Sequence, residues 1–147
     1  MVKRLSAAEV IEKCCGFAKQ SEVIEALQAN ADPLIKELLI GMFHDNIQWD
    51  LPQGAPPYKK SPGLDDQGNL YREARKLYLF VKGGNPNLTR ARREQLFIQF
   101  LEGIHPKDAE FVIAMKDKKS PFKMLTKQVV SKAFPEILPE TKKEDGN

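Results

Sequence analysis

The chain has 147 residues, 41% of them hydrophobic and 29% charged, with 23 Lys and Arg against 20 Asp and Glu. This size and composition are typical of one globular domain, and the lack of any run of 18 apolar residues excludes a membrane-spanning helix. Segment 1–6 lacks the apolar core of a signal peptide, and the only cysteines, Cys14 and Cys15, are adjacent and cannot join distant segments, so we expect a reduced, cytoplasmic setting.

Three helices are predicted in the first third of the chain. Ser6 and Glu9 form a capping-box pattern, and apolar residues follow at helical spacing. Ser21 restarts the chain in a second helix. Asp32 then provides an N-cap, and Pro33 stands at the first helical position, where its missing N–H does no harm. This pattern predicts a third helix.

Residues 50–69 predict a connector instead of a helix, because prolines interrupt the pattern. The acidic sequence at 65–69 predicts a turn. It resembles a calcium loop only at its start, since Lys76 stands where that loop has a bidentate Glu, which excludes a calcium site. A connector of this length either packs on the surface or has a functional role.

Further helices are predicted after the connector. An apolar stripe with helical spacing predicts a helix that stops at the glycine pair 83–84, and its members are Leu70, Ala74, Leu77, Tyr78 and Val81. Thr89 and His105 begin the next two helices, and Thr126 or Ser120 opens the last one.

The pattern as a whole predicts an all-α fold. No alternating strand pattern competes with the helical spacing, and no internal repeat is evident. We expect one compact domain of about six or seven helices over residues 1–139, with the connector at 50–69 and a flexible polar tail at 140–147.

No catalytic constellation is evident. The glycine pair 83–84 has the spacing of a helix stop and does not fit a phosphate-binding loop. Cys14 and Cys15 lie on the apolar side of a predicted helix, so we expect them to pack in the core. His44 and His105 have no other soft ligands nearby, which argues against a zinc site. We expect a non-enzymatic protein without a metal or another cofactor.

Positive charge is concentrated in one region. Residues 1–70 carry 7 basic and 10 acidic side chains, whereas residues 71–132 carry 14 basic and 6 acidic ones, a net charge of +8. Clustered like charge repels itself unless a partner relieves it, so this distribution indicates a face that binds a polyanion. A set of solvated helix faces is the alternative interpretation.

Two predicted helix entrances in this region are basic. The segment 87–93 has three arginines at a helix start, where the macrodipole disfavours cations, and the segment 116–127 repeats the arrangement with lysines. Phosphates bound at the same places would relieve this conflict, because they accept hydrogen bonds from backbone N–H and guanidinium groups together. The candidate DNA-binding residues are Thr89, Arg90, Arg92, Arg93, Lys116, Lys118, Lys119, Ser120, Lys123, Thr126 and Lys127.

The last third of the chain resembles the N-terminal DNA-binding domain of ATP-dependent DNA ligases, most closely that of the compact viral ligases. The similar segments are Leu88-Thr89, residues 108–112, and the stretch from Thr126 to Phe134-Pro135-Glu136-Ile137-Leu138-Pro139-Glu140. The upstream part is compatible, with Asn30-Ala31-Asp32 opening a helix and Gln48-Trp49 preceding the connector, so the resemblance extends over residues 20–140.

The resemblance implies an all-helical domain that binds duplex DNA, nicked or intact, through the minor groove and the phosphate backbone, largely independent of sequence. It also implies a small viral (bacteriophage) protein acting in the host cytoplasm. That family has small residues at the two entrances, whereas this chain has Arg90 and the pair Met124-Leu125. Either long cationic side chains make the contacts here, or DNA binding has been lost.

A ligase also needs a lysine in a K-x-D-G motif within a nucleotidyltransferase fold. The match at Lys143-Glu144-Asp145-Gly146 lies in a charged tail with one residue after it, which excludes ligation by this chain alone. We therefore expect a non-catalytic DNA-binding module. The alternatives are a protein-interaction module on the same scaffold, docking through residues 49–58, and a structural virion component.

Overall fold

The computed structural model describes residues 5–60 and 69–138, and over these ranges the protein consists of helices, loops and one isolated antiparallel bridge between Trp49 and Val81. The α-helices are α1 (Ala7–Cys14), α2 (Gln20–Ala29), α3 (Pro33–Phe43), α4 (Asn69–Glu73), α5 (Arg90–Glu102), α6 (Pro106–Lys116) and α7 (Lys127–Ala133), and a 3-10 helix, η1 (Ala74–Phe80), follows α4. The prediction of an all-α fold is confirmed. None of the helices in the described ranges is long and apolar enough to cross a membrane.

The predicted helix caps are present. Ser6 and Glu9 form a reciprocal capping box at the start of α1, and the side chains of Asp32, Thr89 and Thr126 accept hydrogen bonds from the first turns of α3, α5 and α7. Thr126, and not Ser120, therefore opens the last helix. These caps were readable in the sequence because each contact spans three residues. Of the turn predicted at 65–69, the structure describes only Asn69, which begins α4, and the predicted tail at 140–147 lies outside the described residues.

The helix predicted from residue 70 onward differs from the observed one. The chain forms α4 and then the 3-10 helix η1, in which the buried residues Ala74, Leu77 and Phe80 recur every three residues. A 3-10 helix has three residues per turn, so the position four residues after Ala74 rotates away from the core. Tyr78 was expected in the buried stripe, and it is instead 56% exposed.

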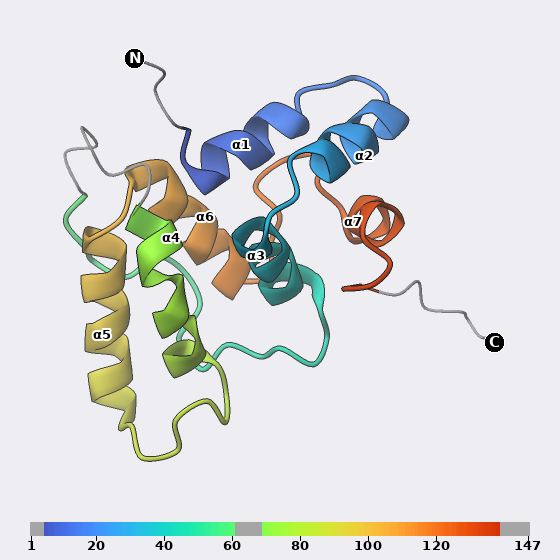
Figure 1. Ribbon diagram of the computed structural model, residues 1–147. Helices are drawn as coiled ribbons and strands as arrows, with labels where there is room; N and C mark the ends of the chain where they lie inside the picture. Colours follow the sequence, from blue (N-terminus) through green and yellow to red (C-terminus); the bar gives the residue numbers. More distant parts are fainter. Residues whose placement is uncertain (1–4, 61–68, 139–147) are drawn as a thin grey trace.

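Figure 1 shows α3 and α6 packed at the centre of the molecule, with α1 and α2 on one side of them. The helix α7 packs against α2, and α5 packs against both α6 and η1. The core between these elements is apolar, and its largest fully buried side chains are Phe80, Phe111, Ile11, Leu27, Ile35, Leu38, Leu39, Met42, Leu70, Leu101, Ile104 and Met115. Both basic entrances lie at the edge of this core.

In the structure the connector starts at His44, directly after α3, and up to residue 60 it folds back onto the helices. The indole N–H of Trp49 donates to the Gly41 carbonyl oxygen at 2.8 Å, and the backbone of Asp50 bonds to Phe80 at 2.7 Å. Trp49, Leu51 and Tyr58 are partly buried against the core. Up to residue 60, the connector is therefore a packed surface segment.

Candidate nucleic-acid interface

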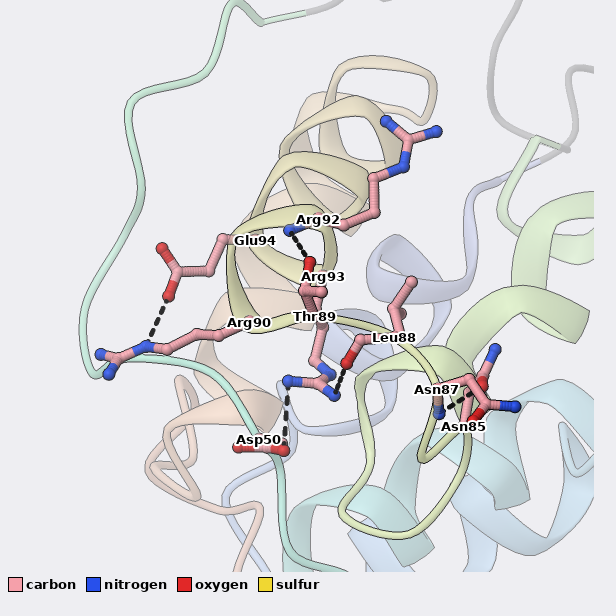
Figure 2. Close-up of polar contacts among 9 residues, drawn as sticks. All are labelled: Asp50, Asn85, Asn87, Leu88, Thr89, Arg90, Arg92, Arg93 and Glu94. Atoms are coloured by element: carbon pink, nitrogen blue, oxygen red, sulfur yellow. Dashed lines mark hydrogen bonds and ion pairs between the residues drawn. The ribbon is translucent and has the colours of Figure 1, made fainter.

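The first basic entrance is the start of α5, where Thr89 caps the helix and three arginines follow. Figure 2 shows that their guanidinium groups diverge. Arg90 pairs with Glu94 at 3.0 Å, and Arg92 bonds to the side chain of Gln95 at 3.0 Å. The three groups therefore do not form one phosphate cradle.

Arg93 points into the protein. Its side chain is only 10% exposed, it pairs with Asp50 at 3.2 Å, and it donates to the Leu88 carbonyl oxygen at 2.9 Å. A buried guanidinium group needs such partners, because burial without them is strongly unfavourable. Arg93 was expected to contact phosphate, but in this structure it fastens the connector to α5.

Lys116, at the end of α6, is also used internally. The residue is 5% exposed, and its ammonium group donates to the Pro52 carbonyl oxygen at 2.7 Å and pairs with the neighbouring Asp117. Asp117 in turn accepts from the backbone N–H of Gly54 at 3.1 Å. Lys116 therefore belongs with Arg93 among the internal cations and not with the residues that a phosphate can reach.

The chain leaves α6 through a left-handed residue that is not glycine. Lys118 has a φ of 59°, and its N–H donates to the Met115 carbonyl oxygen. The N–H of Lys119 donates to the Ala114 carbonyl oxygen. This is the hydrogen-bond pattern of a Schellman motif, whose left-handed position usually holds glycine. The lysine at this position orients its ammonium group toward α3, where it donates to the His44 carbonyl oxygen at 2.8 Å.

Four exposed lysines lie between α6 and the first turn of α7, and we call Lys118, Lys119, Lys123 and Lys127 the loop-lysine cluster. Lys127 pairs at 3.2 Å with Asp45, whose side chain is 83% exposed. Partial burial and the neighbouring Lys127 lower the pKa of Lys118, while Asp45 opposes this shift. Lys118 and Lys127 therefore bring like charges together at the surface.

The hydroxyl groups at this entrance are engaged within the protein. Thr126 accepts from the N–H of Val129 at 3.2 Å as the cap of α7, and Ser120 donates to the Phe122 carbonyl oxygen at 2.9 Å. Thr89 is likewise used as the cap of α5. These three residues shape the loops that carry the cations.

Both basic entrances meet the same stretch of connector, residues 44–54. Lys118 and Lys127 hold its beginning at His44 and Asp45, and Arg93 holds Asp50. Lys116 and Asp117 hold its later part. No local sequence pattern marks these partners, because Lys127 and Asp45 lie 82 positions apart and Lys116 and Pro52 lie 64 apart.

A comparison with known families matches residues 10–121, about three quarters of the chain, to a family of unknown function (DUF6433). The chain belongs to this family. The matched region includes the connector, the first basic entrance and the turn at Lys118, and it ends before Lys123. No curated protein and no solved structure matches the chain.

The described residues offer little for covalent or metal chemistry. Within 5–60 and 69–138, no group of three or more His, Cys, Asp and Glu side chains is placed to hold a metal ion. Cys14 and Cys15 are free and buried, and burial raises the pKa of the Cys15 thiol to about 12. A thiol that stays protonated at neutral pH is a poor nucleophile.

Proposed function

We propose that this protein is a non-catalytic module that binds duplex DNA through its phosphate backbone, with little preference for base sequence. The observation that carries the proposal is the loop-lysine cluster, in which Lys118, Lys119, Lys123 and Lys127 are all exposed between the end of α6 and the first residue of α7. Exposed ammonium groups engage phosphates without reading bases, so such a surface favours sequence-independent binding.

The internal partners of the cluster do not block a phosphate. The pair formed by Lys127 and Asp45 is solvent-exposed, and exposed pairs of this kind stabilise a fold by less than about 1 kcal/mol. A phosphate can therefore replace Asp45 as the partner of Lys127 with little loss of stability. Arg90 and Arg92 are also exposed and lie at the other entrance, where they add positive charge to the same half of the chain.

The choice of duplex DNA as the polyanion rests on the resemblance of residues 88–140 to the DNA-binding domain of ligases. The alternative is protein docking through residues 49–58, of which residues 51–57 line a hollow of about 270 Å³. Trp49, Leu51 and Tyr58 are partly buried against the core. Among the described residues, the exposed large apolar side chains are Leu5, Phe17 and Tyr78, which lie outside that segment.

The test is charge reversal at two matched pairs of lysines. The variant Lys119→Glu/Lys123→Glu alters the cluster, and Lys13→Glu/Lys19→Glu changes the net charge equally at exposed positions near α1 and α2. We expect the first variant to lose at least about tenfold in affinity for a duplex of random sequence at low salt, because each lost phosphate contact weakens binding. The second variant should bind like the unmodified protein.

Fluorescence anisotropy with a labelled duplex measures both affinities, and circular dichroism checks that each variant is folded. Equal losses in the two variants would show that only net charge matters. That result, or no detectable binding at low salt, would overturn the proposal.

A further inference from the structure

The structure contains an apolar hollow of about 370 Å³, and none of the loop-lysine cluster lines it. It is formed by α3, the connector, the end of η1 and the glycine turn that follows. A volume of this size is at the lower end of the range for small-ligand sites, which is about 300–1,000 Å³. The residues that line it are Glu37, Ile40, Gly41, Ile47, Trp49, Leu77, Tyr78, Val81, Lys82, Gly83 and Gly84.

The walls of the hollow are fixed by the backbone. Trp49 is held by its bond to the Gly41 carbonyl oxygen and by the antiparallel bridge to Val81. A side chain at Gly84 would collide with the Tyr78 carbonyl oxygen, and one at Gly41 would lie 2.8 Å from the Trp49 ring. The hollow is therefore a formed feature of this fold with two aromatic side chains in its lining.

Tyr78 stands out in this lining because it is 56% exposed, the largest exposed fraction among the large apolar side chains that the structure describes. The 3-10 geometry of η1 turns it away from the core, as described above. An exposed aromatic ring at the rim of an apolar hollow offers a stacking surface, and nucleobases stack on such rings whatever their sequence.

The rim carries one charge of each sign. Lys82 is exposed at the end of the lining, and Glu37 lies on α3, where partial burial raises the pKa of its carboxyl group. Glu37 and Gly41 lie one turn apart on α3, and the carbonyl oxygen of His44, the residue that follows α3, accepts from Lys118. The hollow and the loop-lysine cluster therefore flank the same end of α3.

The two features also lie close along the connector. Asp45, the partner of Lys127, is two residues before Ile47, which lines the hollow. Two residues span at most about 7 Å, so the backbone at Asp45, whose side chain pairs with Lys127, lies within that distance of the backbone at Ile47 in the wall of the hollow.

We infer that this hollow receives one unpaired nucleobase of a DNA strand whose phosphates contact Lys82 and the loop-lysine cluster. The base would stack on Tyr78, and its N–H groups would donate to the carboxylate of Glu37. The inference rests on the proposed DNA binding and narrows its ligand to DNA with an unpaired base at a single-stranded end or in a gap. An apolar side chain of a partner protein would fill the same volume, but it would leave Lys82 and the loop-lysine cluster without a role.

Because Glu37 is in its lining, the proposed site should prefer some bases over others. A carboxylate only accepts hydrogen bonds, and adenine, cytosine and guanine each carry an exocyclic amino group that thymine lacks. A single unpaired adenine, cytosine or guanine should therefore bind better than an unpaired thymine, whose base has only the N3–H to donate. The exposed position of Glu37 makes Glu37→Ala a variant that should fold normally and lose this difference.

The experiment compares one duplex with blunt ends and the same duplex with a single-stranded overhang, by anisotropy at low salt. We expect the overhang to raise the affinity by about 5-fold to 100-fold, as one or more stacked bases do in other proteins. Tyr78→Ala should abolish this gain and leave the blunt-duplex affinity unchanged. Tyr78→Phe should retain it, because the ring remains.

The matched control is Phe17→Ala, which removes another exposed aromatic ring, 46% exposed and lining a different hollow between α1 and α2. It should keep the gain. Salt-sensitive binding of the blunt duplex, without any gain from the overhang or any effect of Tyr78→Ala, would overturn the base site and leave the proposed function standing. Failure of both duplexes to bind at low salt would overturn the proposed function itself.

Discussion

Asp108 carries a fully buried carboxyl group that joins α6 to α1. It accepts a hydrogen bond from the backbone N–H of Ala8 at 2.8 Å. Asp108 therefore gives a partner to an N–H group of the first turn of α1 that has none within the helix, although the two residues lie 100 positions apart. Burial raises the pKa of Asp108 to about 6, although the Ala8 N–H, the Ser6 hydroxyl and His105 favour the charged form. Glu9 is the neighbouring carboxylate that disfavours it.

This raised pKa predicts a pH dependence of stability. The folded state holds the Asp108 proton more tightly than the unfolded chain, so the free energy of unfolding falls as the pH rises from about 4 to about 6. The decrease is on the order of 3 kcal/mol, and above that range the folded protein retains the full penalty of the buried charge. Asp108→Asn keeps an oxygen for the Ala8 N–H but does not ionise.

Urea unfolding of both proteins between pH 5 and pH 8 measures this effect, because other titrating groups cancel in the difference between them. We expect Asp108→Asn to gain in stability relative to the unmodified protein as the pH rises to about 7 and then to show no further change. A difference that does not vary with pH would contradict the assignment of the raised pKa to Asp108.

At Lys118 we expect one side chain to lower the stability of the fold and to favour DNA binding. Its left-handed backbone disfavours any residue with a Cβ atom, by about 1–2 kcal/mol relative to glycine. Lys118→Gly should therefore raise the free energy of unfolding by up to about 1 kcal/mol, after the loss of the bond to His44 is included. The same change should weaken DNA binding, because one cation of the cluster is lost.

The matched control for this prediction is Lys119→Gly, which removes the next lysine at a residue without positive φ. It should weaken DNA binding to a similar extent and give no gain in stability. Thermal unfolding and anisotropy separate the two effects, and equal stability of the two variants would contradict the strain assigned to Lys118.

At the scale of elements, the connector is fastened to α5 through a buried arginine. Asp50→Ala should lower the free energy of unfolding by about 1–3 kcal/mol, because it leaves the Arg93 guanidinium group buried without its carboxylate partner. Glu94→Ala removes the carboxylate that pairs with the exposed Arg90, and it should change stability by less than about 0.5 kcal/mol. Denaturant titration compares the two, and similar losses would show that burial of Arg93 does not matter.

The elements also show what the sequence could predict. The caps at Ser6, Asp32, Thr89 and Thr126 follow from contacts within one helical turn, so the starts of four helices were readable. The 3-10 form of η1 was not, because the same apolar residues fit a spacing of three or of four. The exposure of Tyr78 follows from that difference.

The same distinction between local and long-range contacts applies to the basic residues. The sequence located both cationic entrances, but it could not tell the buried Arg93 and Lys116 from the exposed lysines beside them. That distinction depends on where the connector folds back, and its contacts join residues far apart in the chain. Of the eleven residues predicted for the site, the cations that remain exposed are the four lysines of the cluster and the two arginines of α5, Arg90 and Arg92.

At the scale of the whole molecule, the concentration of charge in residues 71–132 predicts a steep salt dependence. If the four lysines of the cluster each contact a phosphate, the logarithm of the affinity should fall with the logarithm of the salt concentration with a slope of about −3.6. Affinity should then drop by about 150-fold between 50 and 200 mM salt. A slope shallower than about −1 would contradict phosphate contacts by the cluster.

The contacts of Lys118 and Lys127 with the beginning of the connector have a thermodynamic consequence. The ammonium groups that restrain His44 and Asp45 are the ones that a phosphate would recruit, so ligand and connector compete for them. Such competition is reciprocal. A bound strand weakens the anchoring of residues 44–45 by the same factor by which their anchoring weakens the affinity for the strand. Occupancy of the lysines would then be communicated along the backbone to Ile47 and Trp49, in the wall of the neighbouring hollow.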